Sequence, residues 1–262
     1  MHDHHDDHHR GLAFDLSTLL DRRGMLGLLG GAALTGLVGC GNEAEQGSTA
    51  PTSPTSTAAT EIPDETTGPF PGDGSNGPNV LRQSGIVRSD IRTSFGSASG
   101  VAAGVPLSIE LTVTDNGAAY EGAAVYLWQC NRDGNYSMYA EEIADENYLR
   151  GVQTAGAAGR VRFTSIFPAA YSGRWPHIHF EVYADQDAAT SAADPVKTSQ
   201  LALPEDVCAK VYATSGYEQS AVNIKRTSLD NDNVFGDGYE SQLATVVGSV
   251  SNGYTAKLAV PV

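Results

Sequence analysis

The stretch HIHFEVY, residues 177–183, decides the fold class. Its β-branched and aromatic residues alternate with polar ones, and alternation with a period of two is typical of a strand. The same alternation occurs in residues 107–113 and 159–167. Residues 123–130 (AAVYLWQC) form a more continuous apolar run, as expected of a central strand.

The end of the sequence adds a predicted hairpin. Residues 243–250 and 254–260 flank Ser251-Asn252-Gly253, and Asn-Gly is a strong signal for a hairpin turn. No stretch of the folded part shows a sustained period of 3.6, and there is no internal repeat. The pattern therefore predicts an all-β, two-sheet β-sandwich or a barrel, with long functional loops.

The composition excludes several classes of protein. The chain has 262 residues, of which 40% are hydrophobic, so it can bury a core. Its 16 basic and 31 acidic residues give a net charge of −15, which does not fit a nucleic-acid binder or an electrostatic grip on anionic lipid. Three cysteines are too few for a disulfide scaffold or for an all-cysteine zinc site.

The N-terminal segment is typical of an export signal. Arg22-Arg23 precede an uncharged stretch of 16 residues, 24–39, whereas a membrane span needs about 20 apolar residues. We therefore interpret residues 1–39 as a twin-arginine signal peptide. The segment ends in Leu-Val-Gly-Cys, which resembles a lipobox, so Cys40 is the expected lipidation site. The alternative is a plain secretory signal followed by a chance cysteine.

Residues 40–68 are rich in Ser, Thr, Pro and Ala, and we expect them to form a flexible tether. Residues 69–262 then remain for a single folded domain. The protein is expected outside the cytoplasm, with a lipid anchor as its only contact with the membrane.

The histidines indicate a metal site. Five of the seven lie in the first nine residues, and only His177 and His179 remain after removal of the signal. Side chains at i and i+2 of a strand share a face, so both imidazoles can meet one metal ion while Ile178 faces the core. Glu181 continues that face, but i to i+4 along a strand spans about 13 Å, too far from His177 to share an ion.

Other side chains must complete such a site. Cys130 and Cys208 could form a zinc site with the two histidines. In an oxidising compartment they could instead pair as a disulfide, which we favour over two buried free thiols; a bridge of this kind stabilises by about 2–4 kcal/mol.

Tyrosine is a third option for the remaining ligands. Tyr136 follows the predicted central strand, and Tyr171 lies just ahead of Arg174 and the histidine pair. Tyr139 and Tyr148 are alternatives to Tyr136. A separate acidic loop could hold calcium, although a solvated loop is the simpler interpretation; its polar residues are Asn231, Asp232, Asn233 and Asp237.

The segments WQCNRDGNYS, FPAAY and RWPHIHF occur in this order and resemble the intradiol ring-cleavage dioxygenases, which include catechol and protocatechuate dioxygenases. The resemblance covers at least residues 123–183 and is also consistent with a transthyretin-like sandwich. It implies that Fe(III) is held by Tyr136, Tyr171, His177 and His179. It further implies that Arg174 stabilises negative charge and that Tyr171 leaves the metal and accepts a substrate proton.

The resemblance implies a function as well. A catechol-type diol and O2 would be the substrates, and a cis,cis-muconate-type diacid the product. Three features depart from the family pattern: Pro168-Ala169-Ala170 replaces Pro-Gly-x, Trp175-Pro176 replaces Pro-Ala or similar between Arg174 and His177, and only five residues separate Tyr171 from His177. The rival interpretations are an extracytoplasmic β-sandwich that binds a polysaccharide or protein, and a zinc or copper protein without dioxygenase activity.

Overall fold

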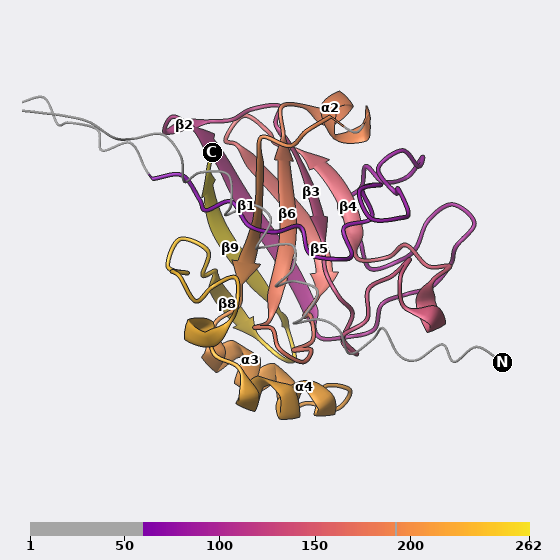
Figure 1. Ribbon diagram of the computed structural model, residues 1–262, viewed down its shortest axis with the longest axis vertical. Coiled ribbons are helices and arrows are strands. Elements are labelled where there is room, and N and C mark those ends of the chain that lie inside the picture. The colour runs from indigo at the N-terminus through magenta and orange to yellow at the C-terminus, as the bar shows by residue number, and fades with distance from the viewer. Residues whose placement is uncertain (1–59, 192) are drawn as a thin grey trace, which may run out of the picture.

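The computed structural model describes residues 60–191 and 193–262 (Figure 1). Within these ranges nine strands form two sheets, with α2 at one end and α3 and α4 at the other. The strands are β1 (Pro106–Asp115), β2 (Ala118–Ala119), β3 (Ala124–Trp128), β4 (Arg150–Thr154), β5 (Arg160–Ile166), β6 (His177–Tyr183), β7 (Lys197–Ala202), β8 (Thr245–Ser249) and β9 (Gly253–Pro261). The helices are α2 (Gln186–Ser191), α3 (Glu205–Tyr212) and α4 (Glu218–Asn223), with 3₁₀ turns at Glu141–Ile143, Ile224–Arg226 and Leu229–Asn231.

The two sheets confirm the predicted β-sandwich. One has the order β2-β1-β9-β8, with β5 also paired to β1, and the other has the order β4-β3-β6-β7. The strands pair antiparallel except for β1 and β9, which run parallel. β8 and β9 form the predicted hairpin, and Gly253 has the positive φ of 79° that favours glycine at its turn.

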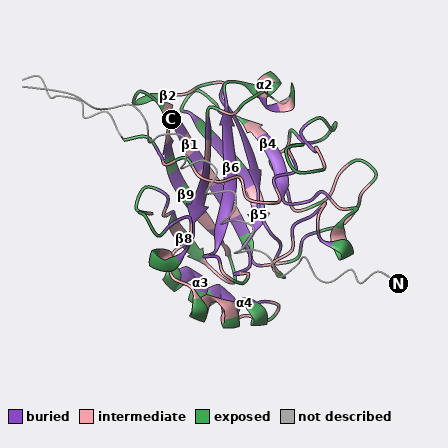
Figure 2. Ribbon diagram, viewed as in Figure 1, coloured by how far each residue is buried: buried purple, intermediate pink, exposed green. Residues whose placement is uncertain are grey.

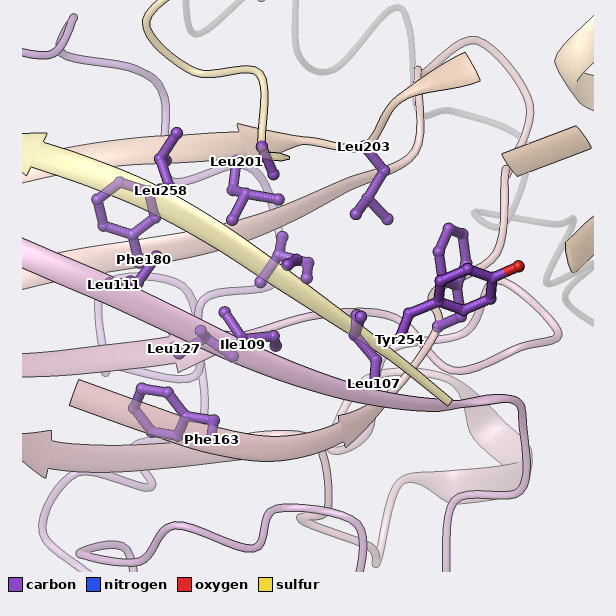
Figure 3. Close-up of a cluster of buried hydrophobic side chains, with 14 of the residues drawn as sticks. Leu107, Ile109, Leu111, Leu127, Phe163, Phe180, Leu201, Leu203, Tyr254 and Leu258 are labelled. Carbon is purple, nitrogen blue, oxygen red and sulfur yellow. The ribbon is translucent and has the colours of Figure 1, made fainter. Parts of the chain in front are cut away.

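The space between the sheets holds the main core. Alternate residues of β1 are buried and face the partner sheet, as Figure 3 shows for Leu107, Ile109 and Leu111. Phe180 of β6 lies in the same cluster, with Ile178 and Val182 on either side of it in the strand. Since side chains alternate along a strand, the other residues of β6 must face outward, and these include both histidines.

The outer face of the second sheet is also covered. In β3, Tyr126 and Trp128 belong to an outer cluster with Val80, Leu81 and Ile86, while the intervening residues face the inter-sheet core. Every residue of β3 and β6 is buried (Figure 2). Burial of both faces explains why residues 123–130 form a continuous apolar run, and it places the outward side chains of β6 away from bulk water.

The ordered domain begins earlier than the expected boundary at residue 69. Ile62 is only 1% exposed, and its N–H donates to the Pro261 carbonyl at 2.9 Å. The Glu65 N–H donates to the Thr198 carbonyl of β7 at 2.8 Å. We call residues 60–72 the N-terminal strap; it crosses the outer side of the second sheet (Figure 1). The predicted signal peptide, Cys40 and the tether up to residue 59 lie outside the described residues.

Several elements were not predicted. β4 and β7 mix polar with apolar residues, so their alternation is weak in the sequence. The helix α3 buries Val207, Cys208 and Val211 on one side, but its eight residues are too short for a sustained period. Glu205 and Asp206 in its first turn favour the helix dipole. No helix in the described part of the chain is long and apolar enough to cross a membrane.

Candidate metal centre

His177 and His179 form the centre of the site. Both are on the outer face of β6 and are 2% and 3% exposed. Their Nε2 atoms lie 3.1 Å apart. Trp128 is the cross-strand partner of His179, and their rings stack at 4.9 Å with an interplanar angle of 7°. The register of β3 on β6 therefore fixes the plane of the His179 ring.

The two imidazoles are neutral and have their Nε2 atoms turned to one point. The Nδ1 of His177 lies 2.5 Å from the Trp175 carbonyl, which can only accept, so Nδ1 carries the proton and Nε2 a lone pair. Burial, followed by the charge of Arg174, lowers the pKa of His177 well below 6.5. Burial, followed by His177, does the same for the pKa of His179. The neutral imidazole is the form that binds a metal, through the lone pair of a ring nitrogen.

Tyr171 adds an oxygen donor to this point. It lies in residues 167–176, a segment without helix or strand that leads into β6. Its hydroxyl is 3.1 Å from Nε2 of His177, and the two rings meet edge to face. The side chain is half-buried, which leaves it the most accessible of the four predicted ligands.

Tyr136 completes the group from the turn after β3. It is 3% exposed, and its ring centroid lies 6.1 Å from those of Tyr171 and His179. Its hydroxyl is buried and makes no hydrogen bond within the described residues. Burial, reinforced by Tyr171, raises the pKa of Tyr136 well above 10. A buried hydroxyl without a partner costs about 1–3 kcal/mol, so this oxygen is suited to bind a metal ion.

The alternative tyrosines are occupied elsewhere. Tyr139 Oη accepts from the Gly72 N–H at 2.8 Å and donates to the Asn76 carbonyl at 3.1 Å. Tyr148 belongs to the core between the sheets. Glu181 accepts from the Tyr183 hydroxyl at 2.7 Å, away from the histidine pair, as the strand spacing predicts. Tyr136 is therefore the tyrosine that the fold turns toward the histidines.

Arg174 lies beside the four side chains and is held by two partners. It is 1% exposed; its Nε donates to Asp232 Oδ2 at 3.0 Å, and Nη2 donates to Gln200 Oε1 at 2.7 Å. Asp232 also accepts the N–H groups of Trp175, Val234 and Phe235. Asp232 is thus a buried ion-pair partner, and its assignment to a solvated or calcium-binding loop was wrong. The sequence did not predict that Asp232 or Gln200 contacts Arg174, because both meet it only through long-range contacts.

The N-terminal strap forms one wall of the site. A Cβ on Gly68 would lie 3.2 Å from Cε1 of His179, so only glycine fits there without displacement, and its φ is +69°. The Phe70 ring packs 5.1 Å from that of Tyr136. Phe235, from the segment that carries Asp232, closes the other side with its ring 6.5 Å from that of His177. The signal for the strap was the GPFPGDG motif that begins at Gly68.

The two cysteines take no part in the site. Both are buried free thiols, so the predicted disulfide is not formed. Cys130 lies in the outer cluster with Sγ 3.8 Å from the Ala169 carbonyl, whereas Cys208 lies in the inter-sheet core with Sγ 3.9 Å from the Leu203 carbonyl. They cannot join the histidines in a zinc site either, since the described residues contain no group of three or more His, Cys, Asp or Glu side chains suited to a metal.

Comparison with known proteins agrees with this geometry. Residues 76–191 match a family model described as Dioxygenase, and this range contains the four predicted ligands and Arg174. The matched residues, which make up less than half of the chain, are similar to this Dioxygenase family. Two walls of the site, the strap and the segment that carries Phe235, lie outside the matched range, so the family match does not extend to them.

Two relatives illustrate the likeness. The structure is similar to an intradiol ring-cleavage dioxygenase from Tetranychus urticae, with a TM-score of 0.56, 24% identity, and coverage of 68% of this chain and 87% of the other. This likeness shows the shared fold. A chlorocatechol 1,2-dioxygenase from Rhodococcus opacus is 29% identical over 89 residues, which cover 27% of this chain and 35% of the relative. The chain thus matches about a third of the length of that curated relative.

Proposed function

We propose that the domain is a non-haem iron(III) intradiol dioxygenase that cleaves a catechol-type diol with O2 to a cis,cis-muconate-type diacid. The observation that carries the proposal is the convergence of two imidazoles and two phenols from three segments of the chain. The His177 Nε2 lies 3.1 Å from both the His179 Nε2 and the Tyr171 hydroxyl. Tyr136 brings a buried hydroxyl without a partner to the same place.

The donor set fits iron(III). Phenolate oxygens are hard, anionic ligands that suit this ion, and two neutral imidazoles complete the set without adding charge. The Trp175 carbonyl holds His177 in the tautomer that a metal requires. The ion would be held by Tyr136, Tyr171, His177 and His179. When bound, it would be chelated by the diol and would withdraw electron density from the ring.

The protein's own groups have distinct roles in this proposal. Both hydroxyls of a diol must lose their protons when it chelates a metal. Tyr171, which would bind the ion as a phenolate, is placed to take one proton on its phenolate oxygen, and a hydroxide ion from solvent would take the other. The Tyr171 side chain is half-buried on an irregular segment, whereas Tyr136 is packed between Phe70 and the histidines. Arg174, fixed by Asp232 and Gln200, would stabilise the negative charge that develops on the substrate.

The proposal is tested by visible spectroscopy of the protein loaded with iron. We expect a broad tyrosinate-to-iron charge-transfer band that is lost or strongly changed in Tyr136→Phe and in Tyr171→Phe. Tyr148→Phe is the matched control, because it removes a buried phenol from the core between the sheets and should leave the band unchanged. Addition of catechol should shift the band and start oxygen uptake.

The same experiment distinguishes the rivals. A colourless protein that binds one zinc ion through His177 and His179 would favour the zinc interpretation. A protein that binds neither metal, and tolerates substitution of all four side chains, would favour a non-enzymatic binding module. Oxygen uptake without a ring-cleaved diacid product would contradict the reaction class proposed here.

We also propose that the domain is exported and anchored by lipid at Cys40. The support is the Arg22-Arg23 pair, the uncharged stretch that follows it and the lipobox-like residues that precede the cysteine. Twin-arginine export carries proteins that have already folded, which suits an iron enzyme that takes up its ion before export. The test is cell fractionation: Cys40→Ala should release the protein from the membrane fraction, and Arg22→Lys with Arg23→Lys should retain it in the cytoplasm.

A further inference from the structure

Arg150, on β4, is a buried cation outside the group of predicted ligands. It is 1% exposed and lies beside the Tyr126 and Tyr139 rings. Its guanidinium donates five hydrogen bonds, all to uncharged acceptors. They are the Ser137 hydroxyl (3.2 Å), the Ser137 carbonyl (2.9 Å), the Phe70 carbonyl (3.0 Å), the Pro71 carbonyl (2.8 Å) and the Tyr126 hydroxyl (3.1 Å).

These acceptors belong to two segments that enclose Tyr136. Ser137 follows Tyr136 directly, so one bond to its carbonyl and one to its hydroxyl hold the residue next to Tyr136. Two more bonds hold the strap at Phe70 and Pro71, and the Phe70 ring packs 5.1 Å from the Tyr136 ring. One guanidinium therefore fixes both the base of Tyr136 and the side chain that covers it.

The strap is shaped to allow this contact. A Cβ on Gly72 would lie 2.8 Å from Nη1 of Arg150, so the backbone can approach the guanidinium only because the residue is glycine. The Gly72 N–H donates to Tyr139 Oη at 2.8 Å, and the Tyr139 ring lies 5.5 Å below the guanidinium carbon. The arginine, the strap and the turn after β3 thus form one hydrogen-bonded unit.

We propose that Arg150 is a positioning residue that clamps Tyr136, and the strap that covers it, in place. The inference rests on the proposed metal site. It assigns this support to the planar fork of a guanidinium, which reaches acceptors in several directions. The ammonium group of lysine carries the same charge but only three protons, so it cannot hold both segments.

The test compares Arg150→Met and Arg150→Lys with Arg88→Met. Arg88 is the matched control because it also donates to backbone carbonyls, those of Arg150 and Asn147, but contacts neither Phe70 nor Ser137. The first readout is hydrogen–deuterium exchange in the metal-free protein. We expect the amides of Gly72, Tyr139 and Ala140 to exchange about tenfold faster in Arg150→Met than in wild type, with no change in Arg88→Met.

The second readout is the visible spectrum after iron loading. Loss of the clamp should shift or weaken the charge-transfer band in Arg150→Met and, to a smaller extent, in Arg150→Lys, with the Arg88→Met band at its wild-type position. Wild-type exchange and an unchanged band in Arg150→Met would overturn the proposal. So would wild-type behaviour of Arg150→Lys, because charge alone would then suffice.

Two further controls keep the outcomes separate. If Arg150→Met does not fold, Ser137→Ala removes a single acceptor of the clamp and should show the same changes at smaller size; no change there would count against the clamp. If the wild-type protein itself stays colourless with iron, the proposed function fails, while the exchange measurement still decides whether Arg150 holds the strap and the Tyr136 turn together.

Discussion

Substitution of Asp232 by alanine should remove a large part of the protein's free energy of unfolding. The side chains of Asp232 and Arg174 are 0% and 2% exposed, so the variant leaves a guanidinium buried without its carboxylate. Removal of one partner of a buried pair costs about 3–5 kcal/mol. The amides of Trp175, Val234 and Phe235 also lose an acceptor, at about 1 kcal/mol each where water cannot replace it.

The two contributions overlap, so we expect a total loss of about 4–6 kcal/mol in the free energy of unfolding. This is a large part of the roughly 5–15 kcal/mol that a domain has in total. The assay is urea denaturation of the protein expressed from residue 60, followed by circular dichroism, with the slope m compared between variants. Asp230→Ala, an exposed neighbour, is the control and should change the free energy by less than about 0.5 kcal/mol.

A double-mutant cycle isolates the ion pair. Arg174→Met combined with Asp232→Ala removes both charges, so the double variant should lose less stability than the two single losses added together. A loss below about 1 kcal/mol in Asp232→Ala, with unchanged m, would refute the reasoning, since it would mean that water reaches Arg174 and replaces the carboxylate. Strict additivity in the cycle would contradict the pairing itself.

Three further predictions follow from the strap and the thiols. Burial, followed by Asp237, raises the pKa of Glu65 to about 7. The folded state therefore holds this proton more tightly than the unfolded state, and stability falls as pH rises from about 4.5 to 7. Glu65→Gln should remove that fall and gain on the order of 1 kcal/mol at pH 8 in urea titrations, and an unchanged pH profile would contradict this prediction. Gly68→Ala places a methyl group 3.2 Å from the His179 ring at a φ of +69°, so iron affinity measured by competition with a chelator should fall. Gly77→Ala, at a φ of +97° but with nothing within 4 Å of the new methyl group, should lose stability without that effect. Cys130 and Cys208 should react with a thiol reagent only after denaturation, and a reducing agent should leave Tm unchanged; a lowered Tm under reduction would show that they pair.

The parts of the site that could be predicted from the sequence are those set by local geometry. Alternation along a strand placed His177 and His179 on one face and Ile178 on the other, and β6 has the bounds of the quoted stretch. The spacing that links Tyr136 and Tyr171 to the histidines came from resemblance, and the fold does bring these side chains together.

What was missed depends on contacts between distant residues. Asp232 and Arg174 are 58 positions apart, and a polar loop sequence does not show that one of its carboxylates turns inward. Residues 60–68 were assigned to the tether from their composition, yet they dock through the buried Ile62, two backbone hydrogen bonds and the close approach of Gly68 to His179. The disulfide was predicted from the expected compartment, whereas the two thiols lie in different clusters of the fold.

The position of the strap makes metal loading and docking of the N-terminal residues one coupled equilibrium. Gly68 contacts His179 and Phe70 contacts Tyr136, so a ligand that binds only the assembled site also favours the docked strap, by RT ln(1 + [L]/Kd). At a free ion concentration of 100 times Kd this amounts to about 2.7 kcal/mol. Protection of residues 60–72 from a protease should therefore rise with iron and fall with a chelator. The first residues of the domain would then report, from outside the proposed metal site, whether the protein carries a metal ion.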